Sequence, residues 1–335
     1  MTRLTILCVV ASAFGLSHAA LAQQRGGAQP QGVREATVTE IPGVVAAGAK
    51  WTLAWQGTNN ADGIVGTKDG GLLFAQEQPS QVSKLDKNDR LSVFLRDTHG
   101  TGALSVDAKG RILAVERTCT DPGRSAAAAP CTEPTVVGVL APERQTLADN
   151  FEGKPLGRLN DLVADKKGGV YFTVGGAYYA NANGRVMSLG ENIRANGIIL
   201  SRDERIVYVT NGNMILAFDI QPDGTVANRR DFGKLEAGGA GDGMAIDAVG
   251  RLYVTSNPGV QVLDAAGKYL GLIPTPRGVI SVAFSGPDKK TLYVVGSGAL
   301  GPDGKEFVTP EGVRNNAKTI YRIPMLAQGF KGRVK

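Results

Sequence analysis

The sequence predicts an all-β fold, a six-bladed β-propeller, and three observations lead to this fold class. The 335 residues include 45 glycines and few amphipathic helical periods, a composition that favours short strands and turns. One phrase recurs six times along the chain: a start that is often polar, a short apolar run, a tight turn and a β-rich run. The intervals between its copies run from 36 to 58 residues, and most are close to the length of a four-stranded propeller blade.

The six copies define the expected first two strands of each blade. They begin at Asp62, Gly102, Asn160, Asn196, Asp242 and Ile280. After each turn, the predicted second strands are residues 72–75, 112–115, 170–173, 206–210, 252–255 and 291–295. Third and fourth strands are predicted most clearly at residues 81–85 with 91–94 and at 260–263 with 269–273.

Material from both ends of the chain is expected to close the ring. The candidates are residues 36–41 or 51–55 near the start and residues 319–323 near the end. A two-sheet sandwich is the alternative architecture, because it is also built from many short strands and turns.

The first residues have the features of a targeting segment. A basic residue precedes an apolar run over residues 4–16, and a small-residue cleavage site follows. Residues 1–22 are therefore predicted to be a signal peptide, with a retained membrane anchor as the alternative. Residues 23–33 are expected to form a flexible leader, and residues 34–335 a single propeller domain. The mature protein is then periplasmic or secreted and has no membrane span.

Composition disfavours several classes of function. The formal net charge is +6, but Lys and Arg are scattered rather than gathered in a stripe, so nucleic-acid binding is not expected. His18 leaves with the signal peptide, and His99 is then the single histidine of the mature chain. This count disfavours a histidine-rich zinc site, and His99 has no nucleophile motif nearby for a Ser-His-Asp arrangement.

Two cysteines remain after processing, Cys119 and Cys131. In an oxidising compartment we expect them to form one disulfide across the short loop between them. By loop entropy such a bond contributes about 2–3 kcal/mol. A catalytic thiol is the alternative role for these residues.

The starts of the six repeats are candidates for a functional site. In a propeller the first strand of each blade lines the central channel, so these positions meet at one channel mouth. Four of the six carry side-chain oxygens: Asp62, Asn160, Asn196 and Asp242. Two carboxylates and two amides suit a hard divalent cation, Ca²⁺ first, with Mg²⁺, Mn²⁺ or Zn²⁺ as alternatives. The sequence therefore predicts a central metal-binding channel, although Asp and Asn before Gly also form ordinary turns.

Several short motifs carry a resemblance to a known family. They are residues 158–161 (Arg-Leu-Asn-Asp), Asn196 with Gly197, residues 242–247, and residues 283–288 followed by 291–294. In order and spacing these segments resemble the senescence-marker-protein-30 (SMP-30)/gluconolactonase/LRE-like family, over roughly residues 62–323. The resemblance implies a six-bladed propeller with a central divalent metal and lactonase or related esterase activity.

The resemblance also implies roles for particular side chains. Asn196 and Asp242 correspond to direct metal ligands, and Asp242 also corresponds to the general base. Asn160 corresponds to an asparagine that contacts metal, water or substrate. Arg158 corresponds to an arginine that binds substrate oxygens.

This sequence departs from the family pattern at the channel mouth. Asp62 stands where the family has a glutamate, and its side chain is one methylene shorter. Gly102 and Ser281 stand where many relatives have asparagine. These departures thin the polar ring, and we expect them to affect substrate and efficiency more than fold.

The function predicted from these residues is hydrolysis of a sugar-like lactone or a related ester. The cation would polarise the carbonyl, and Asp242 would take a proton from the attacking water; a metal-bound hydroxide is an equal candidate for the attacking group. The expected partner is a small-molecule lactone or ester, and no oligomeric state is predicted. The alternatives are a non-catalytic exported propeller that binds a ligand or partner, and a propeller enzyme of another family.

Overall fold

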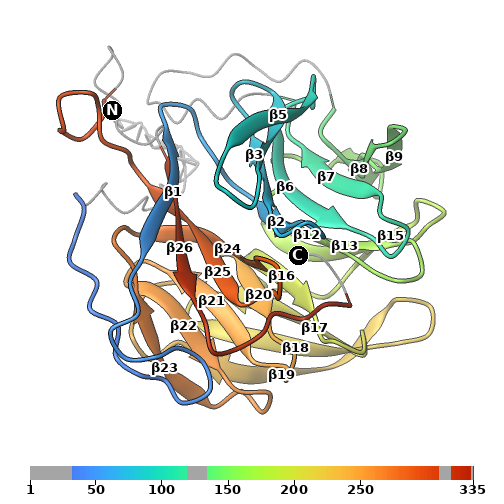
Figure 1. Cartoon of the computed structure of the whole chain (residues 1–335). Helices are drawn as coiled ribbons and strands as arrows, with labels where there is room; N and C mark the ends of the chain where they lie inside the picture. Colours follow the sequence, from blue (N-terminus) through green and yellow to red (C-terminus); the bar gives the residue numbers. More distant parts are fainter. Residues whose placement is uncertain (1–31, 119–133, 309–317, 333–334) are drawn as a thin grey trace, which may run out of the picture.

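The chain folds into six four-stranded antiparallel sheets that stand around a central axis (Figure 1). The computed structural model describes residues 32–118, 134–308, 318–332 and 335. Among these residues the regular elements are all strands, and no helix has the length and apolar character needed to cross a membrane. The predicted all-β fold and the six-bladed β-propeller are confirmed.

Five blades take their four strands consecutively from the chain. Blade 1 consists of β2 (Ile64–Gly66), β3 (Leu72–Gln76), β4 (Gln81–Leu85) and β5 (Leu91–Arg96). Blade 2 consists of β6 (Thr101–Val106), β7 (Ile112–Glu116), β8 (Val136–Ala141) and β9 (Gln145–Ala148). Blade 3 consists of β12 (Leu162–Ala164), β13 (Val170–Val174), β14 (Gly176–Ala180) and β15 (Val186–Ser188). Blade 4 consists of β16 (Ala195–Leu200), β17 (Ile206–Asn211), β18 (Met214–Ile220) and β19 (Val226–Lys234). Blade 5 consists of β20 (Met244–Ile246), β21 (Leu252–Ser256), β22 (Gly259–Leu263) and β23 (Tyr269–Pro274). A two-stranded hairpin, β10 (Asn150–Phe151) with β11 (Lys154–Pro155), lies between blades 2 and 3 in the chain.

Blade 6 closes the ring with strands from both ends of the chain. It consists of β24 (Val279–Ser285), β25 (Thr291–Ser297), β26 (Lys318–Pro324) and, on its outer edge, β1 (Thr52–Gly57). β1 pairs antiparallel with β26. The closure predicted for residues 51–55 is therefore confirmed, whereas residues 36–41 contribute no strand to the ring and only the isolated bridge between Ile41 and Val45.

The second strand of each blade explains how the blades pack. All five residues of β3, and all five of β7 and β21, are buried. A strand reads as a continuous apolar run rather than an alternating one when both of its faces are covered, as here by the neighbouring blades. The hydrophobic clusters accordingly lie between adjacent sheets; one of them packs Tyr171 of blade 3 against Ile198 and Val207 of blade 4.

The hairpins between first and second strands have a repeated turn. Glycines with positive φ complete these turns, for example Gly168 at +87° and Gly250 at +92°. In blade 3 the Asp165 carboxylate accepts the backbone N–H groups of Lys167 (2.8 Å) and Gly169 (2.7 Å), which fixes the turn. Each first strand ends at one of these turns, so the turns lie together on one face of the propeller. The first strands begin on the opposite face, which is called the site face.

Three predictions concern residues outside the described part of the chain. They are the signal peptide at residues 1–22, most of the leader, and the disulfide between Cys119 and Cys131. Export and the disulfide therefore stay predictions.

Candidate active site at the channel mouth

The structure brings the starts of the first strands together on the site face. Asp62, Asn160, Asp242 and Ile280 line one cavity, together with Asp161, Ser281 and Lys335. Asn196 lies beside it, and its side-chain oxygen accepts a hydrogen bond from Asn160 Nδ2. The cavity has a volume of about 20 Å³, room for about one water molecule. All four oxygen-bearing residues predicted from the repeat thus lie at the channel mouth.

Glycines that follow these positions allow neighbouring blades to approach closely. The Gly63 N–H donates to Gly102 O at 2.9 Å, and the Gly243 N–H donates to Ile280 O at 2.9 Å. A Cβ on Gly63 would lie 2.5 Å from Ala103 Cα, and one on Gly243 would lie 2.8 Å from Ile280 O. The glycine after the polar residue therefore serves the narrow channel and not a turn alone.

Threonines at the ends of second strands fix the backbone of the ring. Thr173 Oγ1 donates to Asn196 O at 2.6 Å, and Thr255 Oγ1 lies 3.0 Å from Ile280 O. Thr210 Oγ1 accepts the Gly197 N–H at 2.7 Å. Because these threonines are fully buried, the polar side chains of the ring start from a rigid backbone.

Arg117 lies at the channel mouth and was not predicted from the sequence. Its side chain is 4% exposed, and its Nη1 donates to Asp62 Oδ2 at 2.9 Å and to Glu77 Oε2 at 2.8 Å. Its Nε donates to Leu159 O at 2.9 Å, and its Nη2 lies 3.1 Å from Asn160 O and 3.4 Å from Asn160 Oδ1. A guanidinium has five N–H groups, and these five acceptors account for all of them.

Glu77 connects Arg117 to Arg158. The Glu77 side chain is fully buried, and its two oxygens accept a bidentate pair of hydrogen bonds from Arg158 at 2.8 and 2.9 Å. Arg158 is 36% exposed, so its guanidinium lies at the rim of the mouth with a fixed orientation. Glu77 directly follows β3 and Arg117 directly follows β7. Second strands end on the site face, so the residue after each second strand is a sequence signal that would have found both.

Gly102 is explained by the position of Arg117. A Cβ at Gly102 would lie 2.0 Å from Arg117 Cζ, which is closer than atoms in contact can approach. The ring position of blade 2 therefore carries no side chain of its own, and the guanidinium of Arg117 fills the space that one would occupy.

Charge stabilises this arrangement. Burial alone would lower the pKa of the Arg117 guanidinium, but the carboxylates of Asp62 and Glu77 outweigh burial and raise it. Arg117 is therefore a permanent cation within the polar ring.

The predicted set of metal ligands does not fit a divalent ion in this arrangement. Asp62 is engaged by Arg117, and the Asn160 and Asn196 amides bond to each other. A divalent ion about 4 Å from a guanidinium is repelled by roughly 8 kcal/mol at an effective dielectric constant of about 20. The calcium site stays a prediction from the sequence.

Lys335 brings a second cation to the same cavity. Its Nζ lies 2.5 Å from Asp161 Oδ2 and 2.8 Å from Ile198 O, and its side chain is 7% exposed. The end of the chain lies at the centre of the ring, beside the inner strands β2, β12 and β16 (Figure 1). Phe330, a few residues earlier, bonds to Ile246 O at the other end of the channel-lining strand β20.

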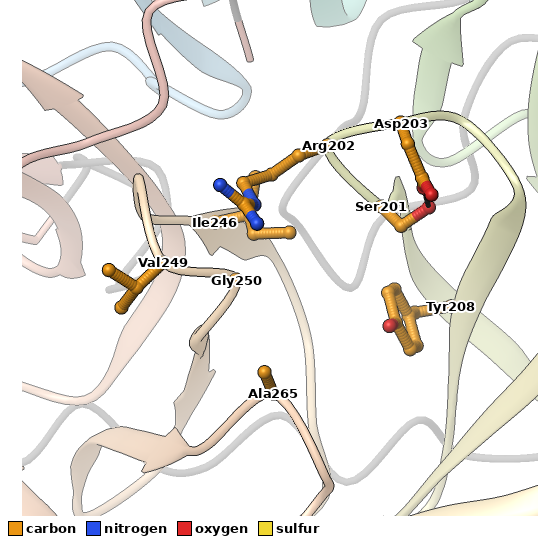
Figure 2. Close-up of a pocket in the computed structure, with 8 residues that line it drawn as sticks. All are labelled: Ser201, Arg202, Asp203, Tyr208, Ile246, Val249, Gly250 and Ala265. Carbon is orange, nitrogen blue, oxygen red and sulfur yellow. Dashed lines mark hydrogen bonds between the residues drawn. The ribbon is translucent and has the colours of Figure 1, made fainter.

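A larger cavity, of about 380 Å³, lies on the opposite face between blades 4 and 5 (Figure 2). Its polar side chains form hydrogen bonds within the chain: Ser201 Oγ donates to Asp203 Oδ1 at 2.7 Å, and Arg202 donates to Ala248 O. None of the four oxygen-bearing residues at the starts of the repeats lines it. The channel mouth is therefore the better candidate for the active site.

Comparisons with known proteins give the same fold. A gluconolactonase of Zymomonas mobilis is 26% identical over 282 residues, which are 71% of this chain and 76% of that protein. The solved structure of a gluconolactonase from Xanthomonas campestris superimposes with a TM-score of 0.66 at 20% identity, covering 89% of this chain and 97% of that one. The structure of regucalcin from Agrobacterium tumefaciens, described as a calcium-binding protein, superimposes with a TM-score of 0.60 at 16% identity, covering 83% and 96%.

A family model agrees with these likenesses. The model of the SMP-30/Gluconolactonase/LRE-like region matches residues 61–298, and this span includes five whole blades, the six ring positions, Glu77, Arg117 and Arg158. The chain belongs to the SMP-30/Gluconolactonase/LRE-like family.

Proposed function

We propose that this protein hydrolyses a sugar-like lactone or a related ester at the channel mouth. The observation that carries the proposal is the convergence of Asp242, Asp62 and Asn160 on one water-sized cavity in a propeller of this family. Its relative in Zymomonas mobilis is a gluconolactonase, which supports a lactone as the substrate.

Asp242 carries the proton transfers of the proposed reaction. A water in the cavity adds to the lactone carbonyl carbon while the Asp242 carboxylate accepts its proton as general base. The bond between that carbon and the ring oxygen then breaks, and the ring oxygen receives the proton from Asp242. The products are a carboxylic acid and the hydroxyl group released from the ring.

Arg158 orients the substrate in this scheme. The cavity holds about one water, so the lactone ring lies above it, against the rim where Arg158 is 36% exposed. The bidentate ion pair with Glu77 fixes the plane of the Arg158 guanidinium. A guanidinium fixed in this way can bind the oxygens of a polar ring without a large loss of side-chain entropy.

Whether the reaction depends on a metal is tested separately from the reaction itself. The family resemblance implies a divalent cation, and a structural relative is described as a calcium-binding protein. Against this stands the guanidinium that engages Asp62. Hydrolysis is therefore measured with added Ca²⁺ and with a chelator, and the chemistry above uses only side chains of the chain itself.

The test is a panel of five- and six-membered sugar lactones, followed through the acid released above the spontaneous rate. Asp242→Asn is expected to lower kcat/KM by at least about 100-fold, the usual contribution of a general base, with thermal stability retained. Asp264→Asn is the matched control, because Asp264 caps an exposed turn of the same blade. Absence of turnover on every lactone, or full activity of Asp242→Asn, would refute the proposal.

A further inference from the structure

We propose that Arg117, with Lys335, takes the place of a divalent metal ion in organising the channel mouth. The inference deepens the proposed function and relies on it only for which end of the channel is the reactive one. The structure carries it through the contacts of Arg117, the space that its side chain fills, and the charge of the ring.

Arg117 holds two of the four side chains that were predicted to bind a central ion. It contacts Asp62 of blade 1 at 2.9 Å and the side-chain oxygen of Asn160 of blade 3 at 3.4 Å. Its remaining N–H groups bind Glu77 and two backbone carbonyls. Because these acceptors account for its five donors, Arg117 is a positioning residue and not one that binds the substrate.

The guanidinium is built into the ring. Its side chain is 4% exposed, and Gly102 leaves the volume that it occupies, since a Cβ there would lie 2.0 Å from Arg117 Cζ. Arg117 also anchors Glu77, whose other partner is Arg158. Displacing the guanidinium would leave Glu77 buried beside one cation instead of two, so the position is held from several sides.

Charge in the ring is close to balance without a metal, since three cations face four carboxylates. Arg117, Arg158 and Lys335 are cations, and Asp62, Glu77, Asp161 and Asp242 are carboxylates, all at or beside the mouth. The cavity they border is water-sized, and the Lys335 ammonium is one of its walls. An ion with two positive charges placed there would face two fixed cations and too little compensating charge.

Metal binding is the direct test, because it does not depend on finding the substrate. The metal-stripped wild-type protein is titrated with CaCl₂ by calorimetry and with MnCl₂ by electron paramagnetic resonance. We expect no saturable binding. Binding of one equivalent that Asp242→Asn abolishes would overturn the inference.

Two variants make the test reciprocal. Arg117→Met keeps a similar volume without charge, and Arg117→Met combined with Lys335→Met removes both cations from the ring. The double variant is expected to gain one saturable Ca²⁺ or Mn²⁺ site and a rise in Tm of several degrees on adding the metal. A double variant that folds and gains no site would overturn the inference. Lys84→Met, which removes a lysine from the outer part of blade 1, is the control and should gain nothing.

Activity separates this inference from the proposed function. A wild-type protein that hydrolyses lactones equally with and without chelator supports both. One that hydrolyses lactones only with a bound divalent ion refutes the inference and leaves the lactonase proposal standing. A protein that neither binds metal nor hydrolyses any lactone supports the inference and refutes the proposed function.

Discussion

Glu77→Gln is the substitution that tests the ionic cluster at the mouth most severely. Glu77 is fully buried, and its two oxygens accept three charged hydrogen bonds, two from Arg158 and one from Arg117, all between 2.8 and 2.9 Å. Glutamine keeps one acceptor oxygen, but its NH₂ group replaces the other oxygen. That NH₂ group then faces an arginine N–H group, and two donors cannot form a hydrogen bond with each other. Both guanidinium groups then lose their shared counter-charge.

The expected loss of stability follows from burial. Removing one partner of a buried ion pair costs about 3–5 kcal/mol, because the remaining charge stays in a poorly solvated place. At roughly 2 °C per kcal/mol for a chain of this size, Tm falls by about 6–10 °C. Urea unfolding followed by circular dichroism, with calorimetry for Tm, measures both quantities.

Asp69→Asn is the matched control for Glu77→Gln. Asp69 pairs with Lys84 at 2.6 Å in the same blade, but its side chain is 57% exposed. An exposed pair of this kind contributes less than about 1 kcal/mol. If Glu77→Gln costs no more than Asp69→Asn, the cluster does not hold the mouth together and the roles given to Arg117 and Arg158 are wrong.

Two further predictions concern blade 2. Gly102→Ala places a Cβ 2.0 Å from Arg117 Cζ, so it should displace the guanidinium and lower stability by about 2–4 kcal/mol, measured by urea unfolding; a neutral result would show that Arg117 is not fixed. Burial raises the pKa of Glu116 to about 7, with Arg144 acting in the opposite direction. Because the folded protein favours the protonated carboxyl, this contribution is fully present below about pH 4 and is lost as pH rises through 7. Glu116→Gln lacks this titration, so the Tm of the variant minus the Tm of the wild type should be larger at pH 8 than at pH 5. An equal difference at both pH values would contradict the raised pKa of Glu116.

Strands were predictable because their signal is local. Continuous apolar runs between turn residues identified all six second strands, from residues 72–75 to residues 291–295, within a few residues of their observed ends. The choice between two closing segments was not decided by the sequence, because both have strand-like composition. Pairing with β26 decides it in favour of β1.

The mouth was predictable only in the part that the repeat carries. Asp62, Asn160, Asn196 and Asp242 occupy equivalent positions, so the repeat aligned them. Arg117 and Glu77 come from the ends of second strands in different blades, 40 residues apart in the chain. Its place directly after a second strand is the one sequence signal for Arg117, and only the fold shows that Gly102 leaves the space it fills.

Asp242 faces opposite demands as a metal ligand and as a general base. A cation bound directly to a carboxylate lowers its affinity for a proton and so weakens it as a base. Arg117 belongs to blade 2, and its contacts are with residues of blades 1 and 3. In a six-bladed ring this places the organising cation opposite blade 5, which carries Asp242. A fixed guanidinium there can hold Asp62 and Asn160 in the polar ring, and under the proposed function Asp242 carries the proton transfer that hydrolysis requires.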